Sequence, residues 1–312
     1  MNRIGRRAFG SIAAAGFLSA CSRSYAGQGS GSSAPSAAPA PSAPSSEWRT
    51  LKFEASTDQP EGQVAQVLVP PNSASLGTII ALHGKGESTK GLEGGAKGWQ
   101  KDYELGRIHE KLLGGPIKSE DVKGFLGPKR LAKINASLSA NPYSGLVVAC
   151  PYAPNLGKPK EDEVQPYARF LISTLLPKVS EATGAPRDRA RTGIDGVSMG
   201  GRLALLVGLS HPEVFSSVGA LQPQIEVKDA EWLADLALRA NQNHKVSLRL
   251  VSSDDDPFLD SVKAFSAALD AVGVAHQKVI TAGPHDYIWN KGPGGCEMLV
   301  FHERVLRSLD PP

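Results

Sequence analysis

The sequence has little excess charge of either sign. Its 34 Lys and Arg are nearly balanced by 31 Asp and Glu, and four of the arginines precede residue 47, where no acidic residue occurs. The lysines of residues 85–133 are scattered and indicate a solvated surface. Because a surface that neutralises phosphates needs clustered Lys and Arg, we expect no nucleic-acid partner.

Long apolar runs, internal repeats and cysteines are also scarce. The apolar run at residues 8–20 is shorter than the roughly 20 residues that a membrane-spanning helix needs. The only cysteines are Cys21, Cys150 and Cys296. With 312 residues, 41% of them hydrophobic, the chain can still bury a sizeable core, and its length suits one large α/β domain.

The first 21 residues have the three parts of an export signal: a basic start, the short apolar run and a small-residue processing site. Arg6 and Arg7 resemble the twin-arginine signal of bacterial export. The sequence Leu-Ser-Ala-Cys ending at Cys21 resembles a bacterial lipobox, whose cysteine is lipidated and becomes the mature N-terminus. We therefore predict a periplasmic or cell-surface lipoprotein anchored to a membrane through Cys21. The alternative is a plain secretory leader with a chance cysteine.

Residues 22–46 are dominated by Gly, Ser, Ala and Pro. A segment with so little to bury is predicted to be a disordered linker, which its prolines keep extended. Such a linker suits a tether between a lipid anchor and a soluble domain. The folded domain is therefore expected to span residues 47–312.

Within that domain, short apolar runs typical of strands alternate with helical patterns. Strands are predicted at residues 64–69, 78–82, 146–149, 192–195, 248–251 and 278–280. Helices are predicted at about 163–183, 200–210, 229–241, 258–272 and 297–308. This alternation predicts a mostly parallel central sheet with helices on both faces.

One connection, residues 87–145, is too long for simple alternation. It is rich in Gly, Lys and Leu, and we expect helices within it at 102–113 and 128–138. A segment of this length beside a functional site can act as a lid. We therefore predict an inserted helical segment with a possible lid role.

The strongest motif is Gly-Val-Ser-Met-Gly-Gly at residues 196–201. It matches G-x-S-x-G, the strained turn between a strand and a helix that exposes a serine hydroxyl above a sheet. A strand pattern precedes the motif and a helical pattern follows it, as this turn requires. Ser198 is therefore the predicted nucleophile.

A serine nucleophile needs a positioned base, which in this arrangement follows the serine and an acid along the chain. His285 follows the last predicted strand, at the sheet edge where sites of parallel sheets form, and is the predicted base. The preceding strand ends at Asp254, Asp255 and Asp256. Asp256, which directly precedes a proline and a helix, is the predicted orienting acid. We expect the other two to cap that helix.

The oxyanion of an acyl-transfer reaction needs two N–H donors. We predict the backbone of Met199, directly after the nucleophile, as one donor. The turn His-Gly-Lys-Gly that begins at His83 follows a buried strand, and the Lys85 N–H is the second candidate. His83 itself is interpreted as a structural turn residue.

Together these motifs resemble the putative-esterase family of the α/β-hydrolase superfamily, which contains esterase D-like and feruloyl esterase-like enzymes. The resemblance covers roughly residues 64–305 and includes the segment 211–220, Asp-Pro-Phe at 256–258 and Gly-Pro-His-Asp-Tyr-Ile-Trp at 283–289. It implies the α/β-hydrolase fold and ester hydrolysis without a metal or cofactor.

The predicted function is a serine-dependent carboxylic ester hydrolase acting outside the cytoplasm through an acyl-enzyme. The substrate is a small or polymer-borne ester: acetyl or aryl esters on polysaccharide and a polyester all fit. One alternative is acyl transfer to an alcohol by the same triad. Another is a non-enzymatic surface binding lipoprotein on a hydrolase scaffold, against which the complete triad argues.

Two alternatives are open for the remaining cysteines. Exported proteins meet an oxidising compartment, and a disulfide between Cys150 and Cys296 would fasten the His285 loop to the scaffold. The other interpretation is two separate buried thiols, which behave as small apolar residues. Sequence separation cannot choose between them, because bridging requires Cα atoms roughly 4.4–6.8 Å apart.

Overall fold

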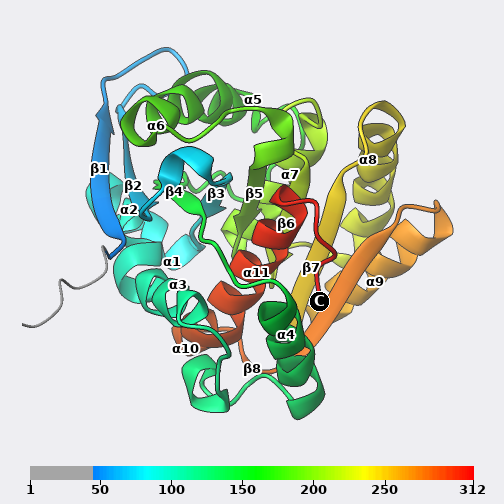
Figure 1. Ribbon diagram of the computed structural model, residues 1–312. Helices are drawn as coiled ribbons and strands as arrows, with labels where there is room; N and C mark the ends of the chain where they lie inside the picture. Colours follow the sequence, from blue (N-terminus) through cyan, green and yellow to red (C-terminus); the bar gives the residue numbers. More distant parts are fainter. Residues whose placement is uncertain (1–44) are drawn as a thin grey trace, which may run out of the picture. The chain divides into compact units, whose positions relative to one another are not determined.

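The computed structural model describes residues 45–312 (Figure 1). The predicted export signal, the lipidated Cys21 and nearly all of the predicted linker lie outside these residues.

The described part of the chain is built on one eight-stranded sheet with the order β1-β2-β4-β3-β5-β6-β7-β8. The strands are β1 Glu47–Phe53, β2 Gln63–Val69, β3 Thr78–Leu82, β4 Val147–Pro151, β5 Thr192–Gly196, β6 Ser217–Leu221, β7 Ser247–Asp255 and β8 His276–Pro284. From β4 to β8 every pairing is parallel, whereas β2 runs antiparallel to both of its neighbours. β1 (blue) and β8 (orange) form the two edges (Figure 1).

Helices cover both faces of this sheet. The α-helices are α1 Lys85–Ser88, α2 Gly91–Ala96, α3 Leu105–Leu113, α4 Pro128–Ala140, α5 Gln165–Phe170, α6 Leu176–Thr183, α7 Met199–Ser210, α8 Ala230–Asn243, α9 Leu259–Ala271, α10 Tyr287–Trp289 and α11 Gly295–Leu306. Short 3-10 turns lie at Ser73–Ser75, Ser119–Val122, Arg189–Arg191 and Val227–Asp229, and π turns at Gly98–Asp102, Leu171–Leu175 and Asn290–Gly294. In the described part of the chain, none of the helices is both long and apolar enough to cross a membrane.

The alternation of side chains along β3 divides the core into two layers. Ile80 and Leu82 join a buried apolar cluster with α5 to α9 on one face, and Ile79 and Ala81 join another with α3, α4 and α11 on the opposite face. This is the period-two pattern of a strand buried on both sides. The predicted α/β fold, with a mostly parallel sheet between helical layers, is confirmed.

Most predicted elements are present with shifted ends, and two strands were missed. β1 is a half-exposed edge strand whose charged outward residues hide its apolar period. β6 is only five residues long and contains Gly219. The helix expected at 163–183 is interrupted by a π turn between α5 and α6. β7 and β8 continue beyond their apolar stretches, to Asp255 and Pro284.

The long connection expected at 87–145 is helical, and α3 and α4 lie close to the expected positions. Its apolar side chains, such as Trp99, Ile108 and Leu138, are buried in the same cluster as Ile79 of β3 and Leu299 of α11. The segment is therefore a layer of the core. Its expected role as a lid stays a prediction.

The disulfide between Cys150 and Cys296 is not formed: both residues are free, fully buried thiols. Cys150 lies in β4, whereas Cys296 lies in α11, which packs over β5, β6 and β7. β3 separates β4 from those strands, so the two side chains belong to different parts of one apolar cluster. Burial raises the pKa of both thiols, as expected for inert apolar packing residues.

Candidate active site

Ser198 occupies a sharp turn between β5 and α7. Its backbone has φ 57° and ψ −116°, a conformation that non-glycine residues rarely adopt. The turn is held between two strands, because the Val197 N–H donates to the Leu82 carbonyl (3.0 Å) and the Ser198 N–H donates to the Leu221 carbonyl (2.9 Å). The sheet therefore holds the serine in its strained position.

The two glycines that flank this turn are required by close backbone contacts. A Cβ atom on Gly200 would lie 2.4 Å from the Leu82 carbonyl oxygen, and one on Gly196 would lie 2.3 Å from the Gly200 carbonyl oxygen. No side chain fits at either position. This explains physically why the G-x-S-x-G spacing predicts the turn.

Ser198, His285 and Asp256 form one hydrogen-bonded chain. The Ser198 hydroxyl donates to His285 Nε2 (3.1 Å), and His285 Nδ1–H donates to Asp256 Oδ1 (2.9 Å). Asp256 is itself fixed, since its carboxylate accepts hydrogen bonds from the Ser252 hydroxyl (2.5 Å) and the Phe258 N–H (3.0 Å). The structure thus brings together the three residues that the sequence pattern selected, in the geometry of a nucleophile, a base and an orienting acid.

Of the three consecutive acids, Asp256 contacts the histidine. Asp254 accepts a hydrogen bond from the Gly283 N–H (2.9 Å), and Asp255 is exposed. Neither caps α9, which begins at Leu259 without a side-chain cap. The expected capping role of these two acids is therefore wrong. The reason is that β7 extends through both, so Asp254 lies beside β8 instead of at the helix.

The two predicted oxyanion donors occupy equivalent positions. Met199 and Lys85 are the first residues of α7 and α1, where backbone N–H groups have no partner within the helix. Within residues 45–312, neither N–H donates a hydrogen bond. A Cβ atom on Gly84 would lie 3.7 Å from Ser198 Cβ, so the turn that carries Lys85 lies against the serine. The oxyanion roles remain predictions that this placement permits.

His83 is buried and holds the turn in place. Its Nδ1–H donates to the Gly84 carbonyl, and its Nε2 accepts from the Ala153 N–H, both at 2.8 Å. Burial lowers the pKa of His83, so it is neutral. These contacts fit the structural interpretation of this residue.

A second Ser–His–Asp set lies inside the protein. His302 Nε2 lies 3.0 Å from Asp195 Oδ2, and its Nδ1 lies 2.7 Å from the Ser217 hydroxyl. All three residues are at most 1% exposed, so no substrate can reach them. Burial raises the pKa of Asp195, as expected for a carboxyl group in the core. This set therefore links α11 to the sheet.

Ser198 and His285 line a cavity of about 240 Å³. Its other lining residues come from the turn at Gly84, from the long helical connection, from the turn that carries Ser198 and from the segment after β8: Gly84, Lys85, Gly86, Glu87, Tyr103, Val197, Asp286, Tyr287 and Asn290. The sequence did not single out Glu87, Tyr103 or Asn290, and Tyr287 entered only as part of the motif at 283–289. For Glu87, Tyr287 and Asn290 the available signal was proximity in the chain to Lys85 or His285, which does not show where a side chain points.

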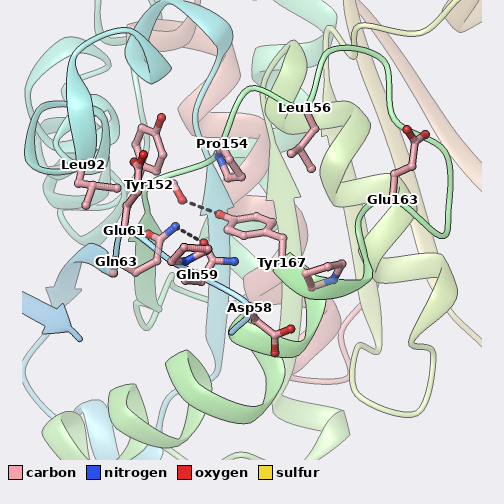
Figure 2. A pocket seen from close by; sticks show the side chains of 13 residues that line it. Asp58, Gln59, Glu61, Gln63, Leu92, Tyr152, Pro154, Leu156, Glu163 and Tyr167 are labelled. Carbon is pink, nitrogen blue, oxygen red and sulfur yellow. Dashed lines mark hydrogen bonds between the residues drawn. The ribbon is translucent and has the colours of Figure 1, made fainter. Parts of the chain in front are cut away.

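A larger cavity of about 350 Å³ lies elsewhere, between the β1–β2 connection and the segment after β4 (Figure 2). Gln63 donates to Gln59 (2.9 Å) in its wall, and the Tyr167 hydroxyl donates to the Tyr152 carbonyl (2.8 Å). No member of the Ser198 chain lines this cavity. The smaller cavity is therefore the candidate active site. In the described residues, no three His, Cys, Asp or Glu side chains are grouped to hold a metal ion.

The fold is that of α/β-hydrolase esterases with solved structures. A ferulic acid esterase matches with a TM-score of 0.61 and 18% identity, over 84% of this chain and 99% of that one. An S-formylglutathione hydrolase from Staphylococcus aureus has a TM-score of 0.58 and 14% identity, over 82% and 98%. Another from Agrobacterium tumefaciens has a TM-score of 0.56 and 16% identity, over 84% and 96%. At these identities the likeness shows the fold.

The family comparison adds the chemistry class. Residues 149–278, which include Ser198 and Asp256, match the model of the family described as "Putative esterase". No curated protein sequence matches the chain. The predicted resemblance to that family and the prediction of an esterase enzyme with the α/β-hydrolase fold are confirmed.

Proposed function

We propose that this protein is a serine-dependent carboxylic ester hydrolase that works through an acyl-enzyme on Ser198. The observation that carries the proposal is the hydrogen-bonded chain from Ser198 through His285 to Asp256, at the edge of a cavity. A hydroxyl becomes a useful nucleophile when a positioned base removes its proton. The family match supports ester hydrolysis as the reaction.

The geometry supports a two-step reaction. His285 Nε2 takes the hydroxyl proton as Ser198 Oγ attacks the ester carbonyl carbon, and the Met199 and Lys85 N–H groups donate to the oxyanion. Collapse of the resulting tetrahedral intermediate breaks the carbon–oxygen bond to the alcohol, and the alcohol receives the proton from His285. Water then attacks the acyl-enzyme in the same way and releases the acid. Asp256 keeps the histidine ring oriented and stabilises its charged form.

The nucleophile is tested by Ser198→Ala with p-nitrophenyl acetate as substrate. We expect kcat to fall by a factor of up to about 10⁶, because loss of one triad member disables the unit. Ser139→Ala, at an exposed position of α4, is the matched control and should keep the wild-type rate. A Ser198→Ala protein that is folded and retains most of the wild-type rate would remove the basis of the proposal.

We also propose that the esterase acts outside the cytoplasm as a lipoprotein anchored through Cys21. The support is the sequence of residues 1–46, with its basic start, apolar run, Leu-Ser-Ala-Cys motif and Ser/Ala/Pro-rich linker. Cys21→Ser should move the protein from the membrane fraction to the soluble fraction without changing its esterase rate. A wild-type protein that is wholly soluble after export would contradict the anchor.

A further inference from the structure

The turn that carries Lys85 depends on side chains for its position, because little of its own structure can hold it. α1, which begins at Lys85, is only four residues long, and so short a helix has little stability by itself. Both backbone polar groups of the preceding residue, Gly84, are bound by side chains. Its carbonyl accepts from His83 Nδ1–H (2.8 Å), and its N–H donates to the Tyr103 hydroxyl (3.1 Å). Tyr103 therefore fixes the residue directly before the predicted oxyanion donor.

The Tyr103 hydroxyl can accept from Gly84 because its own proton is directed elsewhere. Tyr103 is 2% exposed, and its hydroxyl donates to Glu87 Oε2, which leaves an oxygen lone pair for the Gly84 N–H. Burial, and after it the charge of Glu87, hold the pKa of Tyr103 well above its ordinary value, so the proton stays on the hydroxyl. A hydroxyl whose only proton is bound to Glu87 cannot itself donate to an oxyanion. Tyr103 is therefore an acceptor for the turn and not an oxyanion donor.

Glu87, which directs that proton, is itself fixed by its surroundings. It is 1% exposed, and Lys90 Nζ lies 3.7 Å from its Oε1, where it offsets the negative charge. Burial, and after it a hydrogen bond to Glu87, raise the pKa of Tyr287 on α10. A Cβ atom on Gly98 would lie 2.6 Å from Glu87 Cγ, so glycine at this position leaves the room that the carboxylate needs. A buried carboxylate requires such partners, because an unpaired one is strongly destabilising.

Gly84 lies between this pair of side chains and the nucleophile. A Cβ atom on that glycine would lie 3.2 Å from the Tyr103 hydroxyl oxygen, 3.4 Å from Glu87 Oε2 and 3.7 Å from Ser198 Cβ. Within residues 45–312, no hydrogen bond joins Tyr103 or Glu87 to Ser198 or His285. The pair is therefore placed to act on the reaction through the backbone of the turn, without contact with the nucleophile or the base.

We propose that Tyr103 and Glu87 are positioning residues, which hold the turn at Gly84 so that the Lys85 N–H points at the oxyanion. The inference rests on the proposed esterase function and adds two residues that act through its backbone. The long connection at 87–145 supplies both side chains and so takes part in the site. A misdirected oxyanion donor weakens binding of the transition state and leaves binding of the substrate unchanged, so its effect falls on kcat.

Tyr103→Phe removes the acceptor of the Gly84 N–H and keeps the ring. We expect kcat for p-nitrophenyl acetate to fall by about tenfold to a hundredfold, less than for loss of a whole oxyanion donor, with KM within about twofold of the wild type. The acid limb of the pH profile of kcat/KM should keep its midpoint, because His285 and Asp256 are untouched. Tyr167→Phe is the matched control and should keep the wild-type kcat, since Tyr167 is also 2% exposed but its hydroxyl donates to a carbonyl outside the site.

Glu87→Gln and Glu87→Leu test the second member of the pair. Glutamine keeps an oxygen that accepts from Tyr103, so this variant should keep most of the wild-type kcat. Leucine removes the acceptor, so it should lower kcat as Tyr103→Phe does. Because the two residues act as a unit, the double variant Tyr103→Phe, Glu87→Leu should lose no more than the more damaging single substitution. Two unrelated destabilising changes would add instead.

A folded Tyr103→Phe protein with the kcat of Tyr167→Phe overturns the positioning role and leaves the esterase function intact. A loss that appears in KM, or that moves the acid limb, also overturns it, because Tyr103 would then act on the substrate or on the base. If Tyr103→Phe does not fold, the two Glu87 variants decide, and equal kcat values for them overturn the proposal. Failure of the wild type to hydrolyse any ester, together with no labelling of Ser198 by a fluorophosphonate, overturns the proposed function instead.

Discussion

At the scale of single residues, the site depends on one strained backbone and one chosen carboxylate. The Ser198 conformation costs roughly 1–3 kcal/mol by itself and persists because β3 and β6 hold it through hydrogen bonds to Leu82 and Leu221. Asp256 differs from its two acidic neighbours in burial and in its contact with His285. Environment, not residue type, distinguishes these three carboxylates.

The three acids give a sharp test of that distinction. Asp256→Asn should lower kcat by about 10⁴, because the amide favours the wrong histidine tautomer. Asp255→Asn, at an exposed position, is the control and should stay near the wild-type rate. The rates are measured with p-nitrophenyl acetate after circular dichroism confirms folding. A larger loss in Asp255→Asn than in Asp256→Asn would show that the acid is misassigned.

At the scale of secondary-structure elements, the central strands and the order of the catalytic residues could be predicted from the sequence. The wholly apolar runs of β3 and β4 and the turn at Ser198 have strong local signals. β1 and β6 do not, because one is a half-exposed edge and the other is short. Glu87 and Asn290 were also beyond sequence reasoning, since only tertiary packing brings them to the same cavity as Ser198.

Buried charges join the elements on one face of the sheet. Glu297 of α11 forms ion pairs with Arg249 of β7 (3.0 Å) and Arg130 of α4 (2.5 Å). Burial lowers the pKa of Arg249 to about 10, so it remains charged at neutral pH. Removal of its partner would leave a charge in the core, which is far more costly than loss of a surface pair.

Glu297→Ala should therefore lower the free energy of unfolding by about 3–5 kcal/mol. Glu181→Ala removes an exposed pair with Lys178 on α6 and should change it by less than about 1 kcal/mol. Urea unfolding followed by fluorescence measures both. Equal effects of the two substitutions would contradict the role given to the buried network.

At the scale of the whole molecule, stability should depend on pH through His109. This residue is fully buried in α3, neither ring nitrogen has a hydrogen-bond partner within the described chain, and its ring packs edge-on against Tyr143. Burial lowers its pKa to about 4, while the carboxylate of Glu110, 4.0 Å away, opposes this shift weakly. In the unfolded chain the pKa is about 6.5.

The sign of the effect follows from these two values. Below about pH 6.5 the unfolded chain takes up a proton that the folded protein does not, so stability is complete above that pH and falls toward pH 4. His109 should contribute a loss of about 2 kcal/mol between pH 7 and pH 5. His109→Leu removes this contribution, so its stability should fall less over that interval than that of the wild type, as measured by urea unfolding. Identical pH dependence in both proteins would show that His109 does not remain neutral.

The most direct test of the central claim is to find which serine reacts. A fluorophosphonate should add once to the wild-type protein, and peptide mapping by mass spectrometry should locate the adduct on Ser198. Ser217→Ala, which disrupts the buried Ser–His–Asp set, should still be labelled, whereas Ser198→Ala should not. Absence of an adduct on the folded wild type, or an adduct on a serine other than Ser198, would contradict the account.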